Sequence, residues 1–300
     1  GELLSTKIVS MYLESIGAQN SWVDIRKSLK TNKNYREAKV DWEKSEEGIL
    51  KNFHFGSNNI FVTQGFIASS DKDTTTLGRE GSDYTAAIIG SILESEKVII
   101  WKDVPGVLNA DPKWFDDTVL LEGISYKDAI ELTYYGTSVI HPKTIQPLKR
   151  KSIPLYVKSF IEPEGTGTKI SVKDYDRLIP NFIFKMDQVL ISISSKDLSF
   201  IAEDNMETIL GSFARNNLKI NLMQNSATSF QLCVNNDKRR IQQITDELKN
   251  EFNIYTENHL ELATIRYYDQ ATIDRITVNK FILLEQHNQN TVQLVMRDQG

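Results

Sequence analysis

The sequence has one cysteine, four histidines and no long apolar run among its 300 residues. The single cysteine, Cys233, excludes an internal disulfide framework and is typical of a reducing compartment, so we expect a cytoplasmic protein. The histidines lack the spacing of metal ligands, and we predict no metal centre built from side chains. No apolar run approaches the roughly 20 residues that a membrane helix needs, and we expect no membrane partner.

An excess of positive charge is also missing. The chain carries 35 Lys and Arg residues against 40 Asp and Glu residues, a formal net charge of −5. A nucleic-acid partner usually requires a basic face and is therefore not expected. The composition, 40% hydrophobic and 25% charged, is ordinary for a globular protein with a core, and the length suggests about two domains.

One stretch, residues 74–87, combines glycines with charges of both signs. It follows a strand-like apolar run, residues 59–68, and leads into a helix-like run. Small residues between a strand and a helix let backbone N–H groups approach an anion. Arg79 adds a planar cation and Asp83 a negative charge, a combination that fits a zwitterion such as a free amino acid. The alternative is a plain helix start capped by Ser82 or Asp83.

The next apolar run, residues 97–101, is typical of a strand buried in a parallel sheet. With the preceding strand (60–68) and helix (83–96), it predicts a βαβ unit and therefore a three-layer α/β domain. Ligands in such domains bind beyond the carboxyl ends of the strands. Residues 74–83 and 102–113 would both lie there.

Helical periodicity and turn signals predict the other elements of this domain. Helices are expected over residues 3–16, 125–135 and 141–148. His141 opens the last of these, and a capping or packing role is favoured over a general base because no carboxylate is close in sequence. A surface strand pair with a helix is expected between residues 27 and 52, the last strand over 154–160, and a linker over 162–168.

The pattern changes to shorter units after Gln188. Between residues 189 and 268 the expected order of elements is βαββαβ, a ferredoxin-like unit. A further helix over 271–279 and a hairpin over 280–296 predict a second, shortened unit that lacks its last helix and strand.

Four segments stand in a fixed order along the chain: GELLS (1–5), TTTLGREGSDYTAA (74–87), WKDVPGVLNADPK (101–113) and YGTSVIHPK (135–143). They resemble signatures of the aspartate kinase family, and the resemblance covers nearly the whole chain. It implies a three-layer αβα amino-acid-kinase domain over 1–178, a first ACT domain over 185–258 and a second, shortened ACT unit over 259–300. It also implies that the N-terminal part of the catalytic domain, with its Lys-Phe-Gly-Gly segment and catalytic lysine, is missing here.

The resemblance implies that ATP phosphorylates the side-chain carboxylate of L-aspartate to 4-phospho-L-aspartate, the first step of lysine, threonine and methionine biosynthesis. Arg79 stands where the family binds the substrate α-carboxylate, and Glu2 where it binds the α-amino group. Gly81 and Ser82 would line the same substrate site. Asp83, with Arg79 a catalytic residue, would orient the charged groups around the reacting atoms. The alternative for Glu2 is a carboxylate that stabilises a helix start.

The resemblance also implies a site for ATP with Mg²⁺, the metal being held mainly by the phosphates. Ser138 stands where many relatives carry a lysine that neutralises the transferred phosphoryl group, and Lys102 stands where many carry threonine. We expect Lys102 to supply a phosphate-binding ammonium instead. A turn set by the Pro-Gly pair is the alternative for its loop. The nucleotide-binding residues that the resemblance implies are Lys102, Asp103, Leu108, Lys113, Ser138 and Val139.

In the family, the first ACT unit binds an amino-acid effector, and ACT units pair two chains. The resemblance therefore implies lysine or threonine as effector and a homodimer. The effector-binding residues would be Asn221, Gln224, Asn225 and Ser226, after the second strand of that unit. Many lysine-inhibited relatives carry acidic residues near positions 221 and 227, where this chain has Asn221 and Ala227. A polar turn at a sheet edge is the alternative.

Two other functions stay open. Another enzyme of the amino-acid-kinase fold, such as glutamate 5-kinase or carbamate kinase, would share the fold but lacks the residue 79–82 signature and the ACT units. In a different class, the polypeptide could be a catalytically silent, amino-acid-binding regulatory module. A lysine-bearing Lys-Phe-Gly-Gly segment upstream of residue 1 would identify a kinase.

Overall fold

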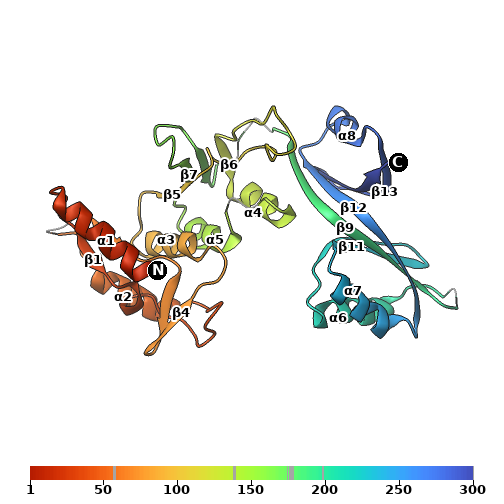
Figure 1. Ribbon diagram of the computed structural model, residues 1–300, viewed down its shortest axis with the longest axis horizontal. Helices are drawn as coiled ribbons and strands as arrows, with labels where there is room; N and C mark the ends of the chain where they lie inside the picture. The colour runs from red at the N-terminus through yellow and green to blue at the C-terminus, as the bar shows by residue number, and fades with distance from the viewer. Residues whose placement is uncertain (57–58, 138–139, 174, 176–178, 198, 300) are drawn as a thin grey trace. The chain divides into compact units, whose positions relative to one another are not determined.

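The computed structural model describes residues 1–56, 59–137, 140–173, 175, 179–197 and 199–299. Their contacts divide the chain into two compact units, one of Gly1–Leu108 with Leu120–Asp176 and one of Asn109–Val119 with Arg177–Gly300 (Figure 1). The segment Asn109–Val119 thus belongs to the second unit, whereas the expected first domain, 1–178, included it. Across the described ranges, we find no helix with the length and apolar character to span a membrane.

Capping residues mark the ends of several helices of the first unit. They are α1 (Glu2–Ser15), the short 3-10 helix η1 (Ile25–Lys27), α2 (Trp42–Asn52), α3 (Gly81–Ile92), α4 (Tyr126–Tyr135) and α5 (Pro142–Arg150). Ser125 caps α4 by accepting a hydrogen bond from the backbone N–H of Asp128, and Gly136 follows its last turn at a φ of 137°. His141 caps α5 through Nδ1, which accepts from the Lys143 N–H at 3.1 Å. The expected helices over 3–16, 125–135 and 141–148 are confirmed.

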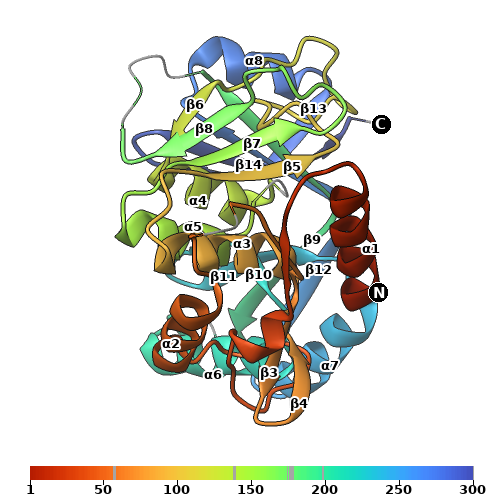
Figure 2. The ribbon, with the colours of Figure 1, turned by 90° about the vertical axis from the view of Figure 1, so that its left-hand side faces the viewer.

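The strands of the first unit form small sheets rather than one large sheet. They are β1 (Ser21–Val23), β2 (Phe61–Thr63), β3 (Ile67–Ser70), β4 (Asp73–Thr76), β5 (Val98–Lys102), β6 (Gly123–Ser125), β7 (Leu155–Ser159) and β8 (Thr168–Ser171). Strands β1 and β2 pair in parallel, β3 and β4 form a hairpin, and the others have the order β5-β7-β8-β6. Helices α3, α4 and α5 lie along one face of that four-stranded sheet (Figure 2).

The strand expected over residues 60–68 is interrupted. Phe66 has a φ of 68°, and the chain bends there between β2 and β3. Only glycine fits at Gly65, because a Cβ there would lie 2.8 Å from the Cα of Ser82. The chain then turns at Asp71, whose φ is 52°, and β3 pairs with β4. Residues 74–76 of β4 were expected to lie in a loop.

Strand β5 pairs in parallel with β7, whereas β3 pairs with β4, so the predicted βαβ pairing is wrong. Strand β7 also pairs with β8, so the strand over 154–160 is not the last of the unit. The expected linker therefore runs directly into a strand at Thr168. Before α2, the expected strand pair is reduced to an isolated bridge between Thr31 and Val40.

One apolar cluster holds the start of α3 in place. It joins η1, α2 and β3 to α3 and to the segment just before it. Leu77, 1% exposed, anchors the turn that follows β4 into this cluster. The buried members are Ile25, Leu29, Ile49, Phe53, Ile67, Ala68, Leu77 and Ile88.

The second unit contains one antiparallel sheet with strand order β10-β11-β9-β12-β14-β13. Its elements are β9 (Asn181–Ser195), α6 (Glu203–Arg215), β10 (Ile220–Asn225), β11 (Ser229–Asn235), α7 (Lys238–Leu248), β12 (Phe252–Arg266), α8 (Gln270–Thr277), β13 (Lys280–His287) and β14 (Thr291–Asp298). The first four strands of this order, with α6 and α7, have the ferredoxin-like arrangement that the sequence predicts.

Strands β9 and β12 are each 15 residues long and run through both halves of this sheet (Figure 1). Residues 188–194 of β9 pair with β11, and residues 181–188 pair with the end of β12. The shortened second ferredoxin-like unit was expected to lack its last strand. Residues 181–188 occupy that position in the sheet, from a part of the sequence far from residues 259–300.

Candidate active site

The glycine turn before α3 leaves the N-terminus of the helix open. Gly78 has a φ of 79°, and Glu80, the residue that precedes α3, has a φ of 53°. The Gly81 N–H donates to the Gly78 carbonyl at 3.1 Å and closes the turn. Ser82 and Asp83 lie inside the first turn, and Glu80 makes no side-chain capping bond, so the alternative of a cap at Ser82 or Asp83 is wrong. Free N–H groups at such a terminus attract an anion.

Arg79 lies within this turn. Its side chain is exposed, and no carboxylate in the described ranges forms an ion pair with its guanidinium. It belongs to a group of charges, with Glu37, Glu80 and Lys143, that act electrostatically on the His141 ring. An unpaired guanidinium beside an open helix N-terminus is suited to hold a carboxylate through two hydrogen bonds.

Asp83 and Lys102 form a charge pair at the same helix end. Lys102 Nζ lies 2.8 Å from Asp83 Oδ2, and the two side chains are 23% and 12% exposed. Asp83 is in the first turn of α3, and Lys102 is the last residue of β5. The expectation that these two segments meet is therefore confirmed for this pair, which places a half-buried ammonium at the carboxyl end of a strand.

Glu37 and Lys143 border the turn as well, although we did not predict them as site residues. Lys143 Nζ lies 2.7 Å from Glu37 Oε1, and this hydrogen bond lowers the pKa of the Glu37 carboxyl. The Glu37 side chain packs against Gly78. The position of Lys143 in the first turn of α5 could have indicated this pair from the sequence. A lysine there faces the positive end of the helix dipole, so a nearby carboxylate stabilises it. Burial lowers the pKa of His141, which keeps its ring neutral as a capping acceptor.

For three predicted residues of the first unit, no hydrogen bond or ion pair with this charge group is found in the described ranges. Glu2 is the exposed first residue of α1, and within the described ranges no hydrogen bond or ion pair joins its side chain to Arg79. Asp103 is exposed just after β5. Leu108 is half-buried and pairs with Leu120.

The other predicted nucleotide-binding residues are not placed with them. Lys113 is exposed on Asn109–Val119 and therefore belongs to the second unit. Its backbone N–H donates to Asp111 Oδ1 at 2.9 Å in a local turn. Ser138 and Val139 lie outside the described residues.

The predicted effector residues divide into two groups. Asn221 is buried, and its side-chain amide donates to Gln188 Oε1 at 2.8 Å and to Asn235 Oδ1 at 2.7 Å. Its oxygen accepts from Lys185 Nζ at 2.9 Å. All the hydrogen-bonding atoms of the Asn221 side chain thus have protein partners, which leaves it poorly suited to contact a ligand directly.

Gln224, Asn225 and Ser226 are exposed at the end of β10. The Ser226 N–H donates to the Ser229 carbonyl at 2.8 Å in the hairpin turn to β11. The loop before α6 reaches the same turn through the Ile201 N–H, which donates to the Ala227 carbonyl at 3.0 Å. These residues form an accessible polar edge between that loop and the hairpin.

Replacing Lys185 with methionine is expected to remove the cost of burying its ammonium below pH 8, a gain on the order of 1 kcal/mol that is offset at every pH by the lost hydrogen bond to Asn221 Oδ1. Burial, with repulsion from Lys219, lowers the pKa of Lys185 from 10.5 to about 8. Between pH 8 and pH 10.5, Lys185 is deprotonated in the folded protein but protonated in the unfolded chain. The free energy of unfolding of the wild type therefore rises with pH, and the gain from Lys185→Met shrinks.

Urea denaturation at pH 6.5 and pH 9.5 measures this difference. Lys238→Met, at the exposed start of α7, is the control and should show no such change between the two pH values. An equal effect of Lys185→Met at both pH values would contradict the assignment.

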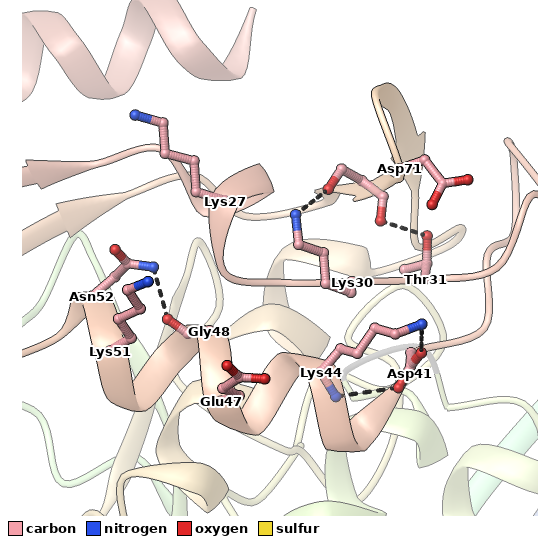
Figure 3. A pocket seen from close by; sticks show the side chains of 11 residues that line it. Lys27, Lys30, Thr31, Asp41, Lys44, Glu47, Gly48, Lys51, Asn52 and Asp71 are labelled. Carbon is pink, nitrogen blue, oxygen red and sulfur yellow. Dashed lines mark hydrogen bonds and ion pairs between the residues drawn. The ribbon is translucent and has the colours of Figure 1, made fainter.

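A separate hollow of about 520 Å³ lies between η1, α2 and the β3–β4 hairpin (Figure 3). Two of its lysines have partners within the lining: Lys44 pairs with Asp41 at 3.0 Å, and Lys30 donates to Ser69 at 3.0 Å. None of the predicted site residues lines it. The lining residues are Lys27, Lys30, Thr31, Asp41, Lys44, Glu47, Gly48, Lys51, Asn52, Ser69 and Asp71.

Comparison of this sequence with known proteins identifies relatives. The sequence profile of the amino acid kinase family matches residues 1–159. Lysine-sensitive aspartokinase 3 of Escherichia coli (strain K12) is 34% identical over 239 residues, 77% of this chain and 52% of that protein. Bifunctional aspartokinase/homoserine dehydrogenase 2, chloroplastic, of Arabidopsis thaliana is 37% identical over 59% of this chain and 20% of that protein. The chain thus spans about half the length of the first relative and less of the second.

Solved structures agree on the fold. E. coli aspartokinase III in complex with aspartate and ADP (R-state) superposes with a TM-score of 0.79 at 27% identity, covering 99% of this chain and 70% of that chain. Aspartate kinase of Clostridium acetobutylicum, at 23% identity, has the same fold with a TM-score of 0.82. The predicted α/β amino-acid-kinase fold followed by a ferredoxin-like unit is confirmed. The chain belongs to the amino acid kinase family.

Proposed function

We propose that this chain acts as an aspartate kinase, which transfers the γ-phosphoryl group of ATP to the side-chain carboxylate of L-aspartate and begins lysine, threonine and methionine synthesis. The observation that carries the proposal is the exposed Arg79 at the open N-terminus of α3, where Asp83 holds the Lys102 ammonium at 2.8 Å. E. coli aspartokinase III, a relative with the same fold, has been solved with aspartate and ADP.

Arg79 would hold the α-carboxylate of the substrate through two parallel hydrogen bonds, because its planar fork matches a carboxylate. The backbone of Gly81 and the exposed Ser82 would complete this anion site. Glu2 would bind the α-amino group. A cation and an anion held at fixed positions recognise the zwitterionic end and leave the side-chain carboxylate free to react.

In the reaction, an oxygen of the side-chain carboxylate attacks the γ-phosphorus, and the bond from that phosphorus to the bridging oxygen breaks. The electron pair leaves with ADP. Charge spreads over the phosphoryl oxygens, so positioning and neutralisation supply most of the catalysis. Lys102 would provide positive charge there, oriented by Asp83. Mg²⁺ would arrive with ATP, held mainly by the phosphates.

The nucleotide contacts of the proposal rest on the motifs around β5 and α5. The candidates are Asp103, Leu108 and Lys113 of the motif that begins at Trp101, and Ser138 and Val139 of the motif that includes His141. Their substitution should change the KM for ATP more than the KM for aspartate.

Ligands that lack one charged group test the substrate site. The test uses two proteins: this chain, and an extended chain in which the N-terminal segment of the E. coli relative precedes Gly1. Calorimetric titration compares L-aspartate, succinate, which lacks the amino group, and β-alanine, which lacks the α-carboxylate. We expect β-alanine to bind at least about tenfold more weakly than L-aspartate. Equal affinities for β-alanine and L-aspartate would contradict the proposal that Arg79 binds the α-carboxylate.

The second unit would act as an ACT-type regulatory domain with an amino-acid effector at the accessible edge formed by Gln224, Asn225 and Ser226. The effector would be lysine or threonine, and inhibition of the active form by each amino acid in turn would distinguish the two.

The assembly would be a cytoplasmic homodimer. Strands β10 and β13 are the edges of the six-stranded sheet, and free edges are where a second copy can pair. Sedimentation of the chain would show whether it forms a dimer or stays a monomer.

A further inference from the structure

The hollow between η1, α2 and the β3–β4 hairpin carries an excess of positive charge (Figure 3). Its charged lining residues are four lysines and three carboxylates, namely Lys27, Lys30, Lys44, Lys51, Asp41, Glu47 and Asp71. Lys44 pairs with Asp41, and Asp71 lies 3.5 Å from Lys33, which is outside the lining. Within the described ranges no carboxylate forms an ion pair with the other three lysines. Three ammonium groups therefore stand against the one remaining carboxylate, that of Glu47.

Lys30 is the most firmly held of these lysines. Its backbone N–H donates to Ser45 Oγ of α2 at 2.9 Å, and its main chain forms a bridge with Ser69 of β3. Its Nζ donates to the Arg26 carbonyl at 2.7 Å and to Ser69 Oγ at 3.0 Å, so both acceptors are neutral and one N–H remains. A half-buried cation is normally paired with an anion. A bound ligand would supply that anion.

The other two lysines come from segments that meet at one end of the hollow. Lys51 is in the last turn of α2, and Lys27 is the last residue of η1. Asn52 Nδ2 donates to Ser28 Oγ at 3.0 Å and joins the end of α2 to the residue after η1. Helix α2 comes this close because of Gly48, where a Cβ would lie 2.5 Å from the Ser28 carbonyl oxygen. The fold thus brings these two exposed ammonium groups to the same end of the hollow (Figure 3).

We propose that this hollow is a binding site for a phosphate-bearing anion. Lysine binds phosphate as a point charge, whereas arginine has the planar fork that matches a carboxylate, and none of the described lining residues is an arginine. A volume of about 520 Å³ is in the range of small-molecule sites and admits a phosphorylated metabolite as well as a free ion. The site does not depend on the proposed function, since no residue assigned to aspartate or ATP lines it.

Calorimetric titration of this chain with inorganic pyrophosphate measures the binding. Lys27→Gln and Lys51→Gln should each weaken it about three- to tenfold, because each removes one ammonium that faces the ligand. Glu47→Gln should strengthen it about two- to fivefold, because it removes the carboxylate that repels the ligand. All three side chains are exposed, so these changes leave the core of the unit intact.

Each kind of variant has a control with the same change in net charge. Lys149→Gln removes an exposed lysine from the last turn of α5, as Lys51→Gln does from α2. Glu46→Gln changes an exposed residue of α2 next to Glu47 that does not line the hollow. Both controls should bind pyrophosphate as the wild type does. Equal affinities of Lys51→Gln and Lys149→Gln would overturn the proposal.

Other ligands identify the chemistry that the hollow selects. Pyrophosphate should bind at least about tenfold more tightly than succinate, a dicarboxylate, and equal affinities would contradict a phosphate site. Inorganic phosphate and β-glycerophosphate distinguish the free ion from a phosphate ester, according to which of the two binds more tightly. Pyrophosphate binding that is lost in Arg79→Ala and kept in Lys51→Gln would assign the anion to the turn before α3 and overturn the proposal.

Discussion

Replacing Arg79 with alanine is expected to raise the KM for L-aspartate about 10- to 100-fold and to leave the KM for ATP unchanged. The exposed guanidinium stands at an open helix N-terminus with no carboxylate partner among the described residues, so its hydrogen-bonding capacity is available to a substrate. Charged hydrogen bonds to a carboxylate contribute about 1.5–3 kcal/mol, which corresponds to this range.

Arg79→Lys keeps the charge but loses the fork, and it should recover only part of the affinity. Arg150→Ala, an exposed arginine at the end of α5, controls for a general loss of positive charge in the same unit. An unchanged KM for aspartate in Arg79→Ala would remove the carboxylate assignment. A fall in Tm shared with the control would point to folding rather than binding.

Replacing Lys102 with methionine is expected to lower kcat by about 10²- to 10³-fold, because the ammonium would neutralise charge that develops on the transferred phosphoryl group. The change also leaves the Asp83 carboxylate, 12% exposed, without its cation. Removal of one partner of a buried pair is destabilising, by up to roughly 3–5 kcal/mol when the pair is fully buried and by less here.

A double variant separates these two effects. Lys102→Met with Asp83→Asn removes both charges, so it should restore most of the Tm that Lys102→Met loses. It should not restore kcat. Wild-type kcat in the Lys102→Met protein would show that this ammonium does not carry the phosphoryl charge, and recovery of kcat in the double variant would show that stability alone was at fault.

Local signals predicted much of the fold. Ser125 and Gly136 define α4 because each acts on its own neighbours, and the same holds for His141 at α5. The pairing of strands could not be read in the same way. Strand β4 consists of Asp and Thr residues that also suit a loop, and only its pairing with β3 makes it a strand. Residues 181–188 complete a sheet whose other strands lie some 80 residues later, so no window of sequence reveals their role.

The candidate site was likewise predictable where local motifs define it and not where it depends on contacts between distant residues. The motif around Arg79 and the strand before Lys102 predict an anion site at a strand end, and the Asp83–Lys102 pair shows that these two segments meet. The docking of Asn109–Val119 on β9 could not be predicted, because it depends on aromatic packing with Phe182 and on Arg275, both remote in sequence. The buried partners of Asn221 were hidden for the same reason, since Gln188 and Asn235 come from neighbouring strands.

The most direct test of the central claim is the formation of aspartyl phosphate. Hydroxylamine converts an acyl phosphate to a hydroxamate, which can be measured with MgATP and L-aspartate for this chain and for the extended chain. We predict aspartyl hydroxamate from at least one of the two forms, no hydroxamate with L-glutamate in place of L-aspartate, and a sharp loss in Arg79→Ala. No aspartyl hydroxamate from either form, with amino-acid binding retained, would contradict the kinase and leave a regulatory module.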